Sequence, residues 1–206
     1  DEQALGPAHP RVGTGLNNLG QLAAAQGNYA DARRLYQRAL AIWEKALGPD
    51  HPDLAPGLMN LGSLHYARHK YAEAESAYRR ALRIQQMHLG PAHPAIAMSW
   101  NNLGMVCYAR RQYGAGEQLY QRSIAMLERT LGAQTPSLAA PLLNLAALYL
   151  AQHRFAETAA LYRRALPLRE RALGADPPQL ADTPETYVLV LRKLAVYAEA
   201  DKMQVR

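Results

Sequence analysis

The chain has 206 residues, 49% of them hydrophobic, and a formal net charge of +6 at pH 7. Its single cysteine, Cys107, excludes an internal disulfide framework and fits a reducing compartment, so a cytoplasmic location is favoured although the compartment stays unknown. No apolar run approaches the roughly 20 residues that cross a membrane, and the arginines are dispersed without a nucleic-acid motif, so neither a membrane nor a nucleic acid is expected as a partner.

One six-residue motif divides the chain into equal parts. The stretch LGPAHP at 89–94 recurs in related forms, and each copy begins 42 residues after the one before it. The copies start at Leu5, Leu47, Leu89, Leu131 and Leu173. A fixed period of this size predicts a stack of similar supersecondary units.

Each period contains two predicted helices, named here helix A and helix B. In the first period, apolar residues follow a helical spacing over 11–26, Gly27 breaks it, and a second helical spacing runs over 29–47. The Gly48-Pro49 pair ends the second helix. The same pattern predicts helix A near 53–68, 95–110 and 137–152, and helix B near 71–89, 113–131 and 155–173.

The chain is therefore expected to be one array over 1–206. Its parts are the end of a preceding helix at 1–6, repeats at about 11–47, 53–89, 95–131 and 137–173, and a truncated last repeat at about 181–206. In that last repeat, Thr183 and Pro184 indicate a helix start. Because 1–5 resembles the end of a helix B at 43–47, we expect the sequence to be a fragment of a longer protein.

Small residues at one position of each helix predict that helices A and B approach closely. They are Gly20, Gly62, Gly104 and Ala146 in helix A, and Ala32, Ala74, Gly116 and Thr158 in helix B. Tyrosines and leucines in two further registers are expected to fill the seam: Tyr36, Tyr78, Tyr120 and Tyr162, with Leu19, Leu61, Leu103 and Leu145.

Two local departures from the pattern carry predictions of their own. Pro167 lies inside the last full helix B, where it removes a backbone donor, so a kink near 163–167 is expected. At the other turns between helices A and B, Gly27 is replaced by bulkier residues, which are expected to adopt the same strained conformation. These residues are His69, Arg111 and His153.

The units resemble tetratricopeptide repeats. The stretch WNNLG at 100–104 matches the opening of that family's pattern, and the step from Ala32 to Tyr36 matches its small-to-aromatic step. The 42-residue period, with its LGPxHP and NNLG phrases, resembles the repeats of kinesin light chain and its bacterial relatives. The resemblance implies an all-α, right-handed solenoid of antiparallel helix pairs that binds other proteins.

The residues that could carry chemistry do not converge. The recurring histidines lie one repeat apart, too far to share a metal ion, and are expected to bond nearby backbone; they are His9, His51 and His93. His65 and His69 have zinc-binding spacing but no third ligand, and Cys107 falls in a register expected to be buried. We therefore predict no catalytic site, no metal and no cofactor.

A row of asparagines is the most informative feature for function. Asn18, Asn60, Asn102 and Asn144 occupy the same position of each helix A, and Asn17 and Asn101 precede two of them. An amide side chain both donates and accepts, so the row could bond the peptide groups of an extended partner segment, as the resemblance also implies. Alternatively, each asparagine bonds the neighbouring helix and holds the stack together; the two roles are compatible.

Helical spacing places Met and aromatic side chains beside this row, namely Met59, Tyr66, Met105 and Tyr108. Few basic residues accompany them, which favours an apolar or aromatic partner segment over an acidic one. A second row, on helix B, is expected to form a solvated convex surface or, alternatively, a docking face for an acidic partner. It consists of Arg38, Arg80, Arg122 and Arg164.

The function predicted from these patterns is binding of a protein or peptide segment in the concave groove of the stack, as an adaptor or scaffold. Two alternatives stay open. The repeats could be the regulatory or sensing domain of a larger effector enzyme, or they could associate with copies of themselves.

Overall fold

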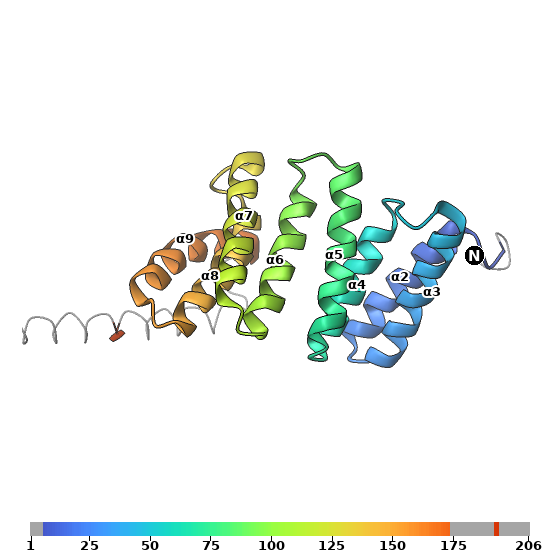
Figure 1. The fold of residues 1–206 in the computed structure, drawn as a ribbon, viewed down its shortest axis with the longest axis horizontal. Coiled ribbons are helices and arrows are strands. Elements are labelled where there is room, and N and C mark those ends of the chain that lie inside the picture. Colours follow the sequence, from blue (N-terminus) through green and yellow to red (C-terminus); the bar gives the residue numbers. More distant parts are fainter. Residues whose placement is uncertain (1–5, 174–191, 194–206) are drawn as a thin grey trace, which may run out of the picture. The chain divides into compact units, whose positions relative to one another are not determined.

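The computed structural model describes residues 6–173 and 192–193, and the described residues fold into α-helices without strands (Figure 1). Every helix predicted within residues 6–173 is present, with ends within two residues of those expected. The helices are α2 (Pro10–Ala25), α3 (Tyr29–Leu47), α4 (Leu54–Ala67), α5 (Tyr71–His88), α6 (Pro94–Ala109), α7 (Tyr113–Leu131), α8 (Ala139–Ala151) and α9 (Phe155–Leu173), with a 3-10 turn η1 (Pro136–Leu138) before α8. The fold is an all-α solenoid of helical hairpins.

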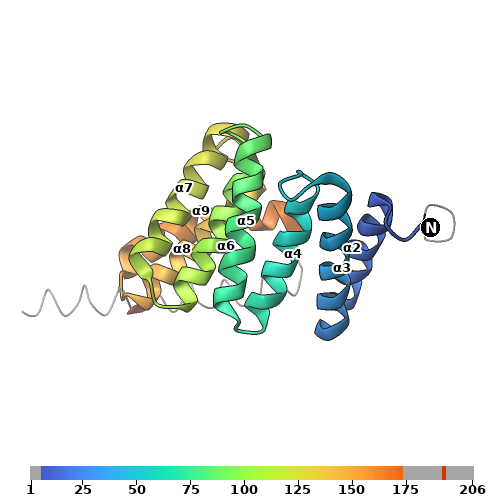
Figure 2. The same cartoon turned by 45° about the vertical axis from the view of Figure 1, so that its right-hand side comes forward.

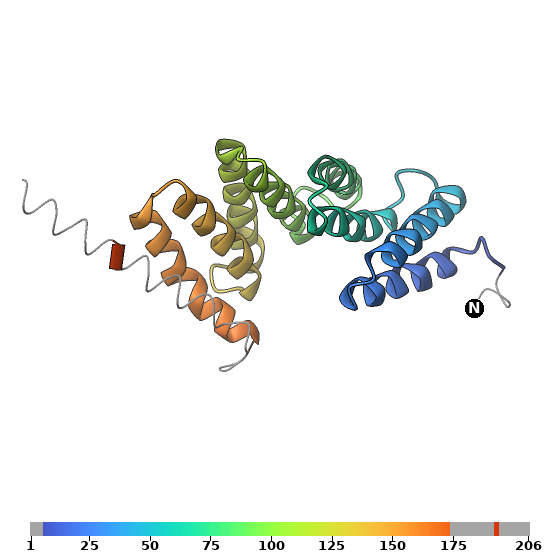
Figure 3. The ribbon, with the colours of Figure 1, turned by 90° about the horizontal axis from the view of Figure 1, so that it is seen from below.

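The chain divides into two compact units, Asp1–Arg110 and Arg111–Arg206. In the first, α2 packs on α3, α4 on α5, and each hairpin contacts the helix that follows it (Figure 2). In the second, α8 lies beside α9 and α7 packs on α8 (Figure 3). The expected preceding helix end at 1–6 and truncated repeat at 181–206 lie almost wholly outside the described residues.

The repeated motif supplies the helix ends. Gly48 and Gly132 follow α3 and α7 with φ of 96° and 86°, a conformation that glycine adopts without a steric penalty. Pro10 and Pro94 open α2 and α6 at their first turn, where a missing N–H costs nothing. The LGPxHP motif thus ends one helix B and starts the next helix A.

The predicted close approach of helices A and B is present. A Cβ atom added to Gly20 would lie 2.6 Å from the Tyr36 ring, and one added to Gly62 would lie 2.5 Å from the Tyr78 ring. Ala32 and Ala74 on the facing helices are fully buried. The glycines therefore make room for the tyrosines that fill these two hairpins.

The leucine seam differs from the prediction at its first member. Leu103 and Leu145 are buried and Leu61 is partly buried, whereas 55% of Leu19 is exposed. The reason is that each later helix A lies against a preceding helix B, and no described helix covers this face of α2. The neighbouring Leu22 is also 55% exposed for the same reason.

The last helix contains its proline without a break. The helix α9 runs for 19 residues from Phe155 to Leu173 and includes Pro167, whose side chain is exposed. A kink near 163–167 stays a prediction, because a continuous helix is compatible with a change of direction at the missing hydrogen bond.

Candidate peptide-binding surface

The recurring histidines cap helices. The Nδ1 atom of His9 accepts a hydrogen bond from the backbone N–H of Arg11 at 3.2 Å, and that of His93 accepts from Ala95 at 3.1 Å. His51 does the same for Asp53 at 3.3 Å. The prediction that these loop residues bond nearby backbone is confirmed, and among the described residues no group of three His, Cys, Asp or Glu side chains is placed to hold a metal ion.

The turns between helices A and B adopt the strained conformation that the sequence predicts. His69, Arg111 and His153 have φ between 58° and 59°, beside 78° for Gly27. Two of the three gain a ring contact in exchange: His69 Nδ1 lies 2.8 Å from the Tyr71 hydroxyl, and His153 meets Phe155 edge-on. These side chains stabilise a turn rather than form a site.

The asparagine row is not uniform in its surroundings. Asn60 on α4 donates from Nδ2 to Oδ1 of Asn17 on α2 at 3.0 Å, and Asn17 is only 7% exposed. On α6, Asn101 donates to Asn102 at 3.4 Å and its Nδ2 lies 4.0 Å from Met105 Sδ. The pair on α2 and α4 therefore ties two successive helices A together, as the structural alternative predicted.

The remaining asparagines of the row differ in exposure. Asn18 is exposed, Asn102 is partly buried, and Asn144 is partly buried with a partner of its own. Asn18 thus offers its amide to solvent, while Asn102 offers Nδ2 and the second lone pair of Oδ1. In this respect Asn18 and Asn102 are suited to a ligand, whereas Asn60 is committed to the contact between helices.

The aromatic and Met side chains beside the row are half-buried. Met59 Sδ accepts from the Ser99 hydroxyl at 3.2 Å, so it packs between α4 and α6. Tyr66 lies 5.6 Å from the Tyr71 ring, and burial, together with Tyr71 and Tyr108, raises the pKa of its hydroxyl. Met98, on the same helix as Met105, is 60% exposed. It is the most exposed large apolar side chain of the described surface.

Cys107 is partly buried rather than part of the closed core that its register predicts. Burial, and then Glu75, raise the pKa of its thiol. A thiol held in its protonated form is a poor nucleophile, so the side chain is not activated.

The arginine row on helix B joins successive repeats. Arg80 on α5 donates to the Glu44 carboxylate of α3 and to the carbonyl oxygen of Pro49, and Arg164 on α9 donates to Glu128 of α7. Arg80 and Arg164 are therefore less free than they would be in a solvated row, because carboxylates pair their charges. A docking face for an acidic partner stays a prediction. The sequence signal was present: Glu44 and Glu128 share one register.

A second inter-repeat cluster was not predicted at all. In the second unit, the Tyr149 hydroxyl donates to Glu117 at 2.7 Å, Arg154 donates to the other Glu117 oxygen at 3.1 Å, and the Arg154 guanidinium lies 3.8 Å above the Tyr149 ring. Glu75 occupies the same register as Glu117 and accepts a hydrogen bond from Arg110 at 2.7 Å. Only the shared register of the two glutamates could have pointed to it.

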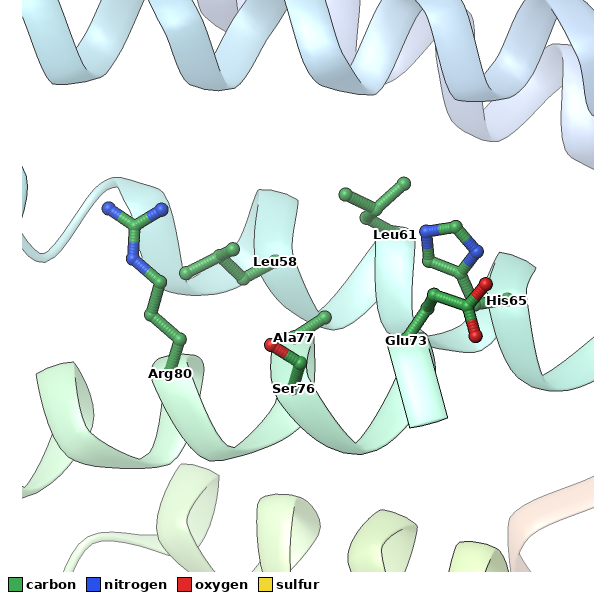
Figure 4. Close-up of a pocket in the computed structure, with 7 residues that line it drawn as sticks. All are labelled: Leu58, Leu61, His65, Glu73, Ser76, Ala77 and Arg80. Carbon is green, nitrogen blue, oxygen red and sulfur yellow. The ribbon is translucent and has the colours of Figure 1, made fainter. Parts of the chain in front are cut away.

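A cavity of about 300 Å³ opens between α4 and α5, on the side that faces the first hairpin (Figure 4). Both apolar and polar side chains line it. The lining side chains are Leu58, Leu61, His65, Glu73, Ser76, Ala77 and Arg80.

No helix among the described residues is both long enough and apolar enough to cross a membrane.

Helical hairpins joined in phase, with a glycine of helix A under a tyrosine of helix B in the first two, define the class of helical-repeat proteins. A sequence model of the tetratricopeptide repeat matches residues 2–87 and 95–171, and a second model of the same repeat matches 59–125. The chain belongs to the tetratricopeptide repeat family. No curated protein sequence matches it.

Solved structures resemble the chain in fold. BtubC (BKLC) from P. vanneervenii is 24% identical with a TM-score of 0.75, over 91% of this chain and 74% of that one. Nearly identical TPR-like repeats assigned to a kinesin light chain of Podosopora anserina are 21% identical with a TM-score of 0.73, over 95% and 93%. Aspartyl phosphate phosphatase F from Bacillus subtilis is 16% identical with a TM-score of 0.73, over 91% and 47%.

Proposed function

We propose that the chain is a protein-interaction module that binds an extended segment of a partner protein along the helix A surface of its first unit. Family membership indicates a protein-interaction repeat in general. The finer proposal is that the amide groups of Asn18 and Asn102 bond the backbone of the segment, while Met98, Tyr66 and Tyr108 contact its side chains.

The observation that carries the proposal is the hydrogen bond between Asn60 and Asn17. Because a side chain of α4 reaches one of α2 at 3.0 Å, the helices A of successive repeats lie close together in this register. A strip of amide, aromatic and Met side chains therefore continues from helix to helix. Amides can bond any peptide backbone, and Met and Tyr adapt to varied side chains.

The test is selection from a phage-displayed library of random peptides on the immobilised chain, followed by calorimetry with a selected peptide. Asn18→Ala and Asn102→Ala should each weaken binding by about 1–3 kcal/mol, the typical cost of an unpaired polar group. Gln37→Ala, an exposed helix B amide, is the matched control and should leave binding unchanged. Unchanged affinity for folded Asn18 and Asn102 variants would contradict the proposal.

A second candidate function is self-association through the exposed edge of α2. Leu19 and Leu22 present apolar surface that the equivalent residues of later repeats bury. Sedimentation of the chain across a range of concentrations tests this. The Leu22→Lys variant should shift a dimer toward monomer, and a monomer at all concentrations excludes this candidate.

A further inference from the structure

Within each unit, one glutamate of helix B binds the repeat that follows it. Glu75 on α5 accepts from Arg110, which follows α6, at 2.7 Å. Glu117 on α7 accepts from Arg154, which precedes α9, at 3.1 Å. In both cases a carboxylate on helix B meets a guanidinium at the turn between the next helices A and B.

The first of these joints lacks its carboxylate. Arg33 on α3 lies one 42-residue period before Glu75, and Arg68 lies one period before Arg110. Neither arginine has an ion pair or a side-chain hydrogen bond with any described residue. The adjacent Arg34 is already paired, because it donates to Asp31 at 3.0 Å. Two guanidinium groups therefore occupy the positions that hold a carboxylate and a guanidinium in the next joint.

Both arginines of this joint act electrostatically on His65. Burial lowers the pKa of His65, and the positive charges of Lys70, Arg33 and Arg68 lower it further, while Glu73 opposes them. Glu73 lies 3.9 Å from Lys70, so its charge is shared with that residue. The arginines are thus close enough to act on one ring, and Glu73, the carboxylate that acts on the same ring, pairs with Lys70 rather than with either arginine.

A cavity lies beside His65, the ring on which the charges of both arginines act. His65 and Glu73 line the cavity between α4 and α5, and Leu61 and Ala77 supply apolar wall beside them (Figure 4). Its apolar lining can contact the methylene groups of a side chain that lies beside His65.

We propose that Arg33 and Arg68 bind the carboxylate of a glutamate side chain from a protein partner, which takes the place that Glu75 holds in the next joint. Guanidinium groups bind carboxylates by paired, charge-assisted hydrogen bonds. The surface lies on helix B and the following turn, and so is separate from the amide strip of α2, α4 and α6. It adds an anchor for an acidic residue to a module whose strip reads backbone.

The test uses the peptide acetyl-Ala-Glu-Ala-amide, with acetyl-Ala-Gln-Ala-amide as its uncharged control, in NMR titrations of the whole chain. The acidic peptide should shift the side-chain Nε–H signals of Arg33 and Arg68 and raise the pKa of His65, because it neutralises nearby positive charge. Arg33→Glu should weaken binding about five- to tenfold. Arg34→Gln, the adjacent paired arginine, should leave it unchanged.

A second measurement checks the register without a ligand. Arg33→Glu should form an internal pair with Arg68 and raise Tm, and adding Arg68→Glu should remove that gain. The proposal is overturned if the two peptides act alike, or if Arg34→Gln weakens binding as much as Arg33→Glu does. The test of the arginine site is independent of the test of the amide strip, because Asn102→Ala should not alter the response to the acidic peptide.

Discussion

At the scale of single residues, backbone approach explains which glycines the chain needs. Gly20 lies under the Tyr36 ring. A Cβ atom added to Gly13 would lie 2.7 Å from the indole nitrogen of Trp43. That nitrogen donates to the Pro10 carbonyl at 3.1 Å, so the indole cannot move aside freely. Gly15, on the same helix, has nothing within 4 Å of an added Cβ.

The two kinds of glycine should respond oppositely to alanine. Gly20→Ala should lower the free energy of unfolding by about 1–3 kcal/mol, the usual cost of overpacking, because Tyr36 is 3% exposed and has no room to withdraw. Gly15→Ala should raise it by about 0.5–1 kcal/mol through helix propensity alone. Urea unfolding of both variants checks this, and equal changes would contradict it.

At the scale of helices, the prediction of elements was accurate because the pattern repeats. Helical spacing, glycine stops and proline starts located every described helix, and even the turn conformation of Arg111 was foreseen. The partners of the asparagines were not, because a register fixes where a side chain lies but not what stands opposite. The residue before each asparagine decides this, and it changes from Asn17 to Met59 to Asn101.

Asn60 and Asn18 share a register but should differ in their effect on stability. Asn60→Ala leaves the buried Oδ1 of Asn17 without its donor, which should cost about 1–3 kcal/mol in the free energy of unfolding. Asn18→Ala removes an exposed amide and should change it by less than about 0.5 kcal/mol. Urea unfolding measures both. A destabilising Asn18→Ala would mean that the amide has a structural partner.

At the scale of the whole molecule, stability resides in the contacts between neighbouring hairpins. In a stacked-repeat protein each unit buries its apolar face only against its neighbours. The cluster of Ala32, Tyr36 and Leu64 is one such joint, formed by α3 and α4. The edge of α2 presents the same register to solvent. Comparing the exposed position on α2 with the buried position on α4 therefore separates the effect of residue type on stability from the effect of stacking.

Leu64 and Leu22 provide the matched pair. Leu64 is 4% exposed and Leu22 is 55% exposed, although both occupy the same position of helix A. Leu64→Ala should lower the free energy of unfolding by about 2–5 kcal/mol, because it opens a cavity against Tyr36. Leu22→Ala should change it by less than about 0.5 kcal/mol at concentrations where the chain is monomeric. If Leu22→Ala destabilises a monomer as strongly as Leu64→Ala does, some part of the chain covers the α2 edge in solution, and self-association through that edge loses its support.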